Sequence, residues 1–170
     1  MASAALHESY MDTTPRAADT NVTNQFVTFT CNGRAFGVDI MAVREIRSWS
    51  PTTELPSQPM GAKGVLDIRG SIIQVYDLAA ILGGGGRLDD AAVSGQVVLV
   101  VSLESQDVGM LVDTVSDIIF AQGEDLRPVP RSSADRGTGM VTGLVKNEDR
   151  LIAILDLTAL FPAESGAAYA

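Results

Sequence analysis

The stretch GVLDIRGSIIQVYDL (Gly64–Leu78) is the most informative part of the sequence, because it recurs later in the chain as GLVKNEDRLIAILDL (Gly143–Leu157). The two stretches align without gaps, with their first glycines and their final Asp-Leu pairs in register. Upstream, residues 26–46 align in the same way with residues 98–118. An internal repeat of this kind predicts two copies of one small structural unit.

Short β-strands dominate each copy of the repeat. Val27, Phe29 and Cys31 alternate with threonines, which is typical of a strand with one buried face. The following Asn-Gly pair at residues 32–33 is a favoured two-residue hairpin turn. Residues 96–103 are mostly apolar and predict a strand buried on both faces. The sequence therefore predicts an all-β protein with two pseudo-symmetric lobes, packed on a shared seam with a groove between them.

Helices are predicted to be few and short. Residues 40–46 carry an apolar side chain at every third position, which indicates one or two helical turns after Asp39. Asp77 and Asp156 each precede a short apolar run, and each carboxylate can cap the free N–H groups of a first helical turn. The same two carboxylates could instead form a general acid and base pair.

Composition divides the chain into one domain with a tail at each end. Residues 1–24 are rich in Ala, Ser, Thr and Asp and predict a disordered tail, and residues 163–170 predict a flexible C-terminal tail. The remaining domain, residues 25–162, divides into lobe one at about residues 25–90 and lobe two at about residues 91–162. The sequence leaves open whether strands are exchanged between the lobes.

The charge of the chain excludes several kinds of partner. The formal net charge is −9, which opposes nucleic-acid binding because phosphate affinity rests largely on Lys and Arg. It also disfavours an anionic membrane surface, but it suits a protein partner that carries a basic patch. No apolar stretch approaches the roughly 20 residues that span a membrane. Because the first 24 residues also lack a secretory signal, we expect a cytoplasmic protein.

Few residues could support catalysis. His7 is the only histidine and falls in the predicted tail, which argues against Ser-His-Asp or Cys-His chemistry. The tetraglycine at residues 83–86 lacks the Lys-Ser/Thr pair of a phosphate loop and predicts a linker. The sequence therefore predicts no catalytic residue, no cofactor and no metal. The alternative is an enzyme or a nucleic-acid binder built on a small barrel, since a fold does not dictate function. The carboxylates considered as metal ligands lack the spacing of a calcium loop; they are Asp67, Asp77, Asp89, Asp90 and Asp156.

Three single side chains each allow two interpretations. Glu45 and Arg69 lie among apolar neighbours and are either unrelated surface charges or a pair that orders a binding surface. Trp49, the sole tryptophan, either packs at the edge of the core or serves as a binding hot spot.

Several motifs in order resemble the CheW family of chemotaxis coupling proteins. Residues 37–46 (GVDIMAVREI) are similar to the opening motif of that family, and residues 63–73 (KGVLDIRGSII) are similar to its central motif. Residues 108–115 (VGMLVDTV) resemble a third, so the resemblance covers nearly the whole domain. The chain departs from the family at Asp67, where Asn is usual, and at Gln74, where Pro is frequent.

The resemblance implies two five-stranded SH3-like β-barrels packed on a shared hydrophobic seam. It implies a non-enzymatic scaffold that couples the cytoplasmic hairpin tips of methyl-accepting chemoreceptors, held in the groove, to the regulatory domain of the histidine kinase CheA, held at the outer barrel ends. Such a protein is expected to be a monomer when isolated and to join a large membrane receptor array. The alternative is an adaptor of a non-flagellar chemosensory pathway, such as surface motility. Matched motif by motif, the partner-binding positions are Val43, Glu45, Gly64, Arg69, Val98, Gly109, Val115 and Ile118.

Overall fold

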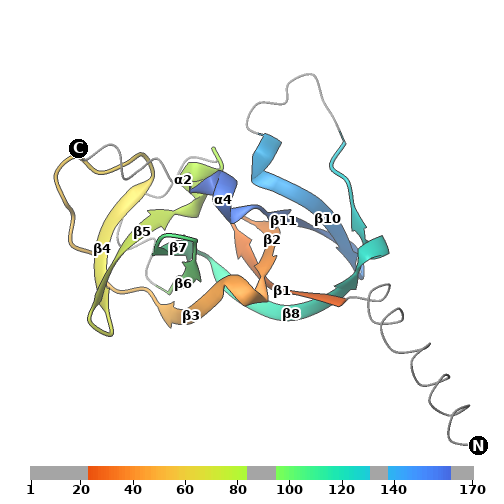
Figure 1. Cartoon of the computed structure of the whole chain (residues 1–170), viewed down its shortest axis with the longest axis horizontal. Coiled ribbons are helices and arrows are strands. Elements are labelled where there is room, and N and C mark those ends of the chain that lie inside the picture. Colours follow the sequence, from red (N-terminus) through yellow and green to blue (C-terminus); the bar gives the residue numbers. More distant parts are fainter. Residues whose placement is uncertain (1–22, 84–94, 131–137, 162–170) are drawn as a thin grey trace, which may run out of the picture.

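The computed structural model describes residues 23–83, 95–130 and 138–161, and strands account for most of them (Figure 1). The first half of the chain forms β1 (Thr23–Cys31), β2 (Arg34–Asp39), the 3-10 turn η1 (Ile40–Ala42), β3 (Val43–Ser48), β4 (Ala62–Ile68), β5 (Ser71–Asp77) and α2 (Leu78–Ile81). The second half forms β6 (Val97–Ser102), β7 (Asp107–Val112), β8 (Thr114–Gln122), η2 (Gly123–Asp125), β9 (Leu126–Arg127), η3 (Thr138–Met140), β10 (Val141–Asn147), β11 (Arg150–Leu155) and α4 (Leu157–Leu160).

The predicted tails fall almost entirely outside these ranges. β1 begins at Thr23, two residues inside the predicted N-terminal tail. Residues 1–22, residues 84–86 of the tetraglycine and residues 163–170 lie outside the described residues.

The strands form two sheets that confirm the all-β prediction. One sheet has the order β3-β6-β7-β5-β4, and the other has the order β8-β1-β2-β11-β10-β9. We call these sheets barrel one and barrel two. Each barrel takes a hairpin from one half of the chain and its other strands from the other half, through the parallel pairs β5–β7 and β2–β11. Five strands were predicted in each barrel; barrel two has a sixth, the two-residue β9.

The exchanged hairpins pack against each other and form the shared core. Val27, Phe29 and Cys31 on β1 meet Leu99 and Val101 on β6 there, and all five are buried. The alternation predicted for β1 is therefore confirmed, because residues at every second position of a strand point to one face. Burying each such side chain stabilises the fold by about 1.5–3 kcal/mol.

Each barrel also has a core of its own behind the shared one. Val98 and Val100 alternate with Leu99 and Val101 along β6 and pack inside barrel one. Phe26, Ile119 and Ile154 pack in the same way inside barrel two. β6 is thus buried on both faces, as its continuous apolar sequence predicts.

The two Asp-Leu pairs begin the short helices α2 and α4. The Ala79 N–H donates to Asp77 Oδ1 at 3.1 Å, and the Thr158 N–H donates to Asp156 Oδ1 at 3.0 Å. Both aspartates are therefore helix caps, as one of their two interpretations held. The Met41 N–H donates to Asp39 Oδ1 at 2.9 Å in the same manner and starts η1.

The predicted helix over residues 40–46 is only partly right. The 3-10 turn ends at Ala42, and Val43 already belongs to strand β3. A bulge shifts the β3–β6 register between the pairs Val43–Val101 and Glu45–Val100. The extra residue returns Ile46 to the same face as Val43, so the spacing of three comes from a bulge in a strand.

Candidate functional site

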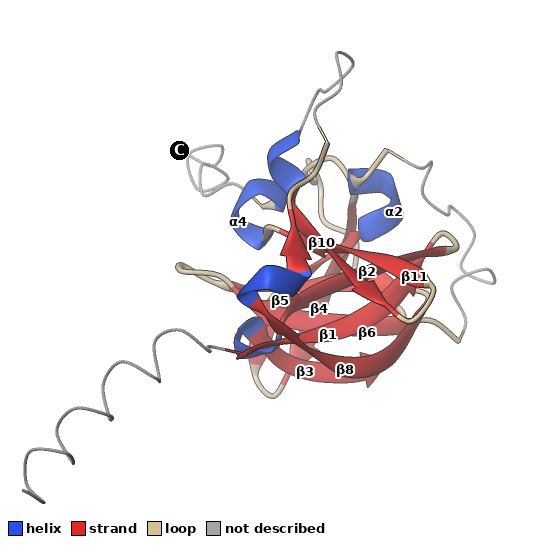
Figure 2. Cartoon of the chain, turned by 90° about the vertical axis from the view of Figure 1, so that its right-hand side faces the viewer, coloured by secondary structure: helices blue, strands red, loops and turns tan. Residues whose placement is uncertain are grey.

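The edge strands β3 and β8 carry the first candidate surface. Each is the outermost strand of its barrel, and both lie on the side of the molecule opposite α2 and α4 (Figures 1 and 2). Val43 and Ile46 pair with Val101 and Leu99, whose side chains point into the shared core. Directly paired residues of antiparallel strands share a face. The apolar side chains of β3 therefore continue the face of the shared core out to the edge.

β8 repeats this arrangement on barrel two. Val115 pairs with Phe29, Ile118 with Val27 and Phe120 with Gln25 along β1. A bulge again separates the first two pairs, at the position equivalent to the bulge in β3. We call the five side chains Val43, Ile46, Val115, Ile118 and Phe120 the edge-strand surface.

The outer members of the edge-strand surface are open to solvent. Ile46 is 48% exposed, Ile118 is 49% exposed and Phe120 is 66% exposed. Val43 and Val115 are half-buried and pack against the shared core. Exposed apolar side chains gathered on one face are the signature of an interaction site. Ile46 and Phe120 were not among the predicted site residues, and the pairing of Ile46 with Ile118 in the repeat is the signal that could have found the first.

The second candidate surface lies on the other face of β3. Arg69 Nε is 3.2 Å from Glu45 Oε1, and Arg47 Nη1 is 3.7 Å from Glu45 Oε2. The Arg69 side chain is 82% exposed, whereas that of Glu45 is 24% exposed. Glu45 therefore anchors one edge of the guanidinium and leaves its remaining N–H donors free to face a partner. Of the two interpretations of these charges, the structure supports the ion pair.

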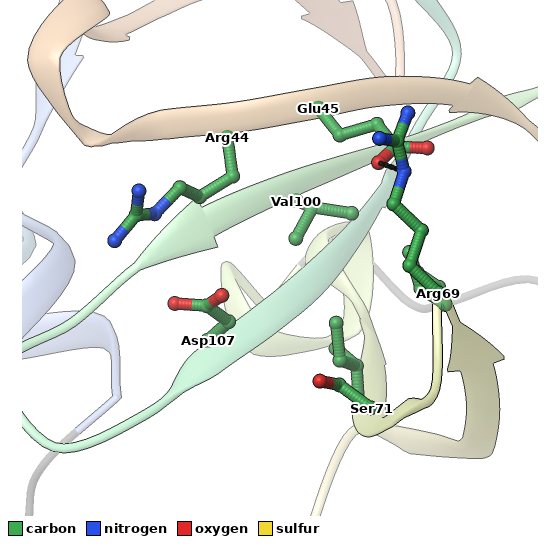
Figure 3. Close-up of a pocket in the computed structure, with 8 residues that line it drawn as sticks. Arg44, Glu45, Arg69, Ser71, Val100 and Asp107 are labelled. Atoms are coloured by element: carbon green, nitrogen blue, oxygen red, sulfur yellow. Dashed lines mark ion pairs between the residues drawn. The ribbon is translucent and has the colours of Figure 1, made fainter.

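A cavity of about 330 Å³ opens beside this ion pair, at the mouth of barrel one. In Figure 3, the Glu45–Arg69 pair stands at one end of the cavity, and Arg44 and Asp107 stand at the other. The apolar floor comes from the barrel core, including Val100. We call this region the barrel-one mouth; its lining residues are Arg44, Glu45, Ile68, Arg69, Ser71, Ile73, Val100 and Asp107.

Arg69 is presented by a tight hairpin turn between β4 and β5. Arg69 and Gly70 both have positive φ, at 55° and 89°, which is the backbone of a type I′ turn. The Gly70 N–H donates to Asp67 Oδ1 at 2.9 Å. Asp67, where the chain departs from the usual Asn, thus keeps an acceptor for the turn, and the turn holds the Arg69 Cα at the rim.

Three of the predicted site residues on barrel one are buried. Val98 is fully buried, and the Cβ of an alanine at position 109 would lie 2.9 Å from its Cγ1. Gly64 has a φ of 135° and would place a Cβ 2.6 Å from the Thr53 carbonyl oxygen. These positions can therefore influence a partner only through the shape of the barrel. Among the predicted positions that reach the surface, Val43, Val115 and Ile118 belong to the edge-strand surface. Glu45 on β3 and Arg69 on the β4–β5 turn belong to the barrel-one mouth.

Trp49 packs at the margin of the barrel-one core. It is half-buried against that core, and Lys63 Nζ lies 5.8 Å from its ring centroid. This placement matches the core-edge interpretation, since the ring is covered on one side by the barrel and on the other by a cation.

The fold and its surfaces define the chain as a two-barrel β protein with separate apolar and charged surfaces. The family model for the CheW-like domain matches residues 25–165. Chemotaxis protein CheW of Rhizobium meliloti is 35% identical over 85% of this chain and 92% of its own length. Chemotaxis protein CheW of Klebsiella aerogenes is 31% identical over 89% of this chain and 90% of its own length. The chain belongs to the CheW-like family.

A solved structure agrees with this assignment. The scaffolding protein TtCheW from Thermoanaerobacter tengcongensis aligns with a TM-score of 0.73 and 28% identity, over 84% of this chain and 94% of the other. No helix within residues 23–83, 95–130 and 138–161 is long and apolar enough to cross a membrane. Within the same ranges, no three His, Cys, Asp or Glu side chains gather closely enough to hold a metal ion.

Proposed function

We propose that this protein is a chemotaxis coupling scaffold that joins chemoreceptor tips to the regulatory domain of the histidine kinase CheA and catalyses no reaction itself. Its relatives carry the name chemotaxis protein CheW, and its structural neighbour is described as a scaffolding protein. These names favour chemotaxis over an adaptor of another chemosensory pathway. The protein acts in the cytoplasm, is monomeric when isolated, and is recruited to receptor arrays by its partners.

The main support for the proposal is that the two faces of β3 contribute to two different surfaces. Val43 and Ile46 contribute to the edge-strand surface, and Glu45 contributes to the barrel-one mouth. Two partners can therefore bind one barrel without sharing a contact residue. Simultaneous binding raises the effective concentration of each partner near the other and fixes their relative orientation.

The edge-strand surface suits the receptor. A receptor tip is a helical hairpin, and a helix offers an apolar stripe that such a surface can cover. Addition of a β-strand to β3 or β8 is disfavoured, because the bulge in each edge strand twists it out of regular pairing.

The barrel-one mouth suits the kinase domain. Its paired charges give orientation and specificity more than affinity, and the exposed Arg69 donors fit a carboxylate or backbone carbonyl on the partner. The apolar floor beneath them can take an aliphatic side chain.

Two single variants test the division of labour. Ile118→Asp should abolish binding of a receptor cytoplasmic fragment and leave binding of the CheA regulatory domain unchanged, as measured by isothermal titration calorimetry. Arg69→Glu should weaken binding of the CheA regulatory domain and leave binding of the receptor fragment unchanged. Met60→Asp is the matched control for the first variant, because Met60 is 92% exposed but lies beside Gly61, which contacts α2 on the opposite side.

The proposal fails if the unchanged protein binds neither fragment at micromolar concentration. It also fails if Ile118→Asp and Arg69→Glu weaken both partners equally, because one shared surface would then serve both.

A further inference from the structure

The edge-strand surface has a pseudo-two-fold symmetry that comes from the repeat. Val43 corresponds to Val115, and Ile46 corresponds to Ile118. One member of each pair lies on β3, beside β6, and the other lies on β8, beside β1. The two edge strands carry bulges at equivalent positions. A surface with this symmetry alone would accept a helical hairpin in two opposite orientations with nearly equal affinity.

One pair of positions breaks that symmetry. Ser48 ends β3, and the residue that corresponds to it on β8 is Phe120. Both side chains are exposed, and both lie on the face of the apolar pairs, since Ser48 pairs with Val97 and Phe120 with Gln25. Within residues 24–83, 95–130 and 139–161, Phe120 is the one exposed aromatic side chain.

The backbone around Phe120 is held firmly. Its neighbours Ile119 and Ala121 are buried in the core of barrel two. The β1–β8 pairing extends beyond it to the pair Thr23–Gln122. An exposed aromatic ring on an anchored strand loses little conformational freedom on binding, which is why such rings are frequent binding anchors.

We propose that Phe120 sets the orientation of the bound receptor tip, so that the hairpin can lie only one way round on the edge-strand surface. This inference rests on the proposed function, because it assumes the receptor tip as the occupant. In the favoured orientation the apolar stripe of the hairpin covers Phe120, and in the reversed orientation the stripe meets Ser48 and leaves the ring in water. The cost of leaving a phenyl ring exposed corresponds to a preference of roughly tenfold or more.

The experiment is a paramagnetic labelling measurement on the complex. A receptor cytoplasmic fragment carries a nitroxide on one helix, and the isoleucine δ1-methyl groups of this protein carry ¹³C. The label should broaden the methyl signal of only one of Ile46 and Ile118 in the unchanged protein. Phe120→Ser places a serine at both equivalent positions, 48 and 120, of the two edge strands. It should lower the affinity for the receptor fragment roughly tenfold and broaden both methyl signals partially.

A double variant provides the positive test. Phe120→Ser combined with Ser48→Phe moves the ring to the other barrel, and the broadened signal should change from one isoleucine to the other. Met60→Ser, an exposed apolar residue outside the surface, should change neither affinity nor broadening. Thermal unfolding should show that each variant is folded, because the changed positions are exposed.

The outcomes separate the two proposals. If the receptor fragment does not bind the unchanged protein, the proposed function fails and this inference fails with it. If the fragment binds and Phe120→Ser keeps the original affinity and one-sided broadening, only the orientation role of Phe120 is overturned.

Discussion

Arg69→Glu should weaken kinase binding while leaving the fold almost unchanged. The Arg69 side chain is 82% exposed, so its ion pair with Glu45 is largely solvated and contributes no more than about 1 kcal/mol to the free energy of unfolding. The backbone should accept the change, because Glu148 occupies the equivalent turn of the second repeat with a φ of 57°, against 55° for Arg69. Glu45 can keep its contact with Arg47.

The effect on association should be larger. Reversing the charge removes the outward guanidinium donors and sets two carboxylates at the rim of the same cavity. A reversal of this kind typically costs about 1–3 kcal/mol of binding, or roughly five- to 150-fold in Kd. Titration calorimetry with the CheA regulatory domain measures the loss, and urea unfolding measures stability.

Arg34→Glu is the matched control for net charge. It makes the same change of charge at an exposed residue of β2, away from the barrel-one mouth. Equal losses of affinity for Arg34→Glu and Arg69→Glu would contradict a specific role of Arg69 in kinase binding, because the effect would then come from net charge alone. A fall of several kcal/mol in the free energy of unfolding of Arg69→Glu would also contradict the prediction, because Arg69 would then be needed for the fold.

Three further variants test how the barrels are built. Gly109→Ala should lower the free energy of unfolding by about 1–3 kcal/mol, because its Cβ would lie 2.9 Å from Val98 Cγ1. Val98→Ala should also destabilise, because Val98 is fully buried, but urea unfolding should show that the double variant loses less than the sum of the two single losses. Additive losses would contradict a steric cause. Gly64→Ala should lose more, since its Cβ would lie 2.6 Å from the Thr53 carbonyl oxygen and its φ is 135°; a Tm within a degree of the unchanged protein would contradict this. Asp77→Ala should lower the free energy of unfolding by about 1 kcal/mol, because α2 loses its N-terminal cap. Asp77→Asn should largely keep the thermal stability of the unchanged protein, and an equal loss in both variants would contradict the capping role.

Much of the fold could be predicted from local patterns. The alternation along β1 and the continuous apolar run of β6 identified buried faces, because successive side chains of a regular strand point to opposite faces. The capping role of Asp77 and Asp156 could be read from the residue that precedes each helical run.

Local patterns could not predict which distant strands pair with each other. A period of two tells which face of a strand is buried, but not which strand lies beside it. The pairing of β1 with β8 joins residues that are far apart along the chain, and it depends on the packing of both hairpins together. The strand order is therefore a property of the whole molecule.

The bulge in β3 explains the helix that was wrongly extended over residues 43–46. Val43 and Ile46 are three residues apart and share a face, which is also the signature of a helical turn. The bulge turns Glu45 to the opposite face of β3, where its carboxylate pairs with Arg69. The bulge therefore explains both the helix-like spacing of the apolar residues and the position of the ion pair. The exposure of Phe120 was equally hidden, since it depends on β8 being an edge strand.

If the proposed function is right, one molecule of this protein holds two partners at once on separate surfaces. Sedimentation velocity of this protein with a receptor cytoplasmic fragment and the CheA regulatory domain, all at micromolar concentration, measures whether all three proteins join one complex. The two faces of β3 predict a ternary complex whose mass is the sum of all three proteins, and in which neither partner lowers the affinity of the other. Two binary complexes that displace one another, with no ternary species at saturating concentrations, would contradict the account.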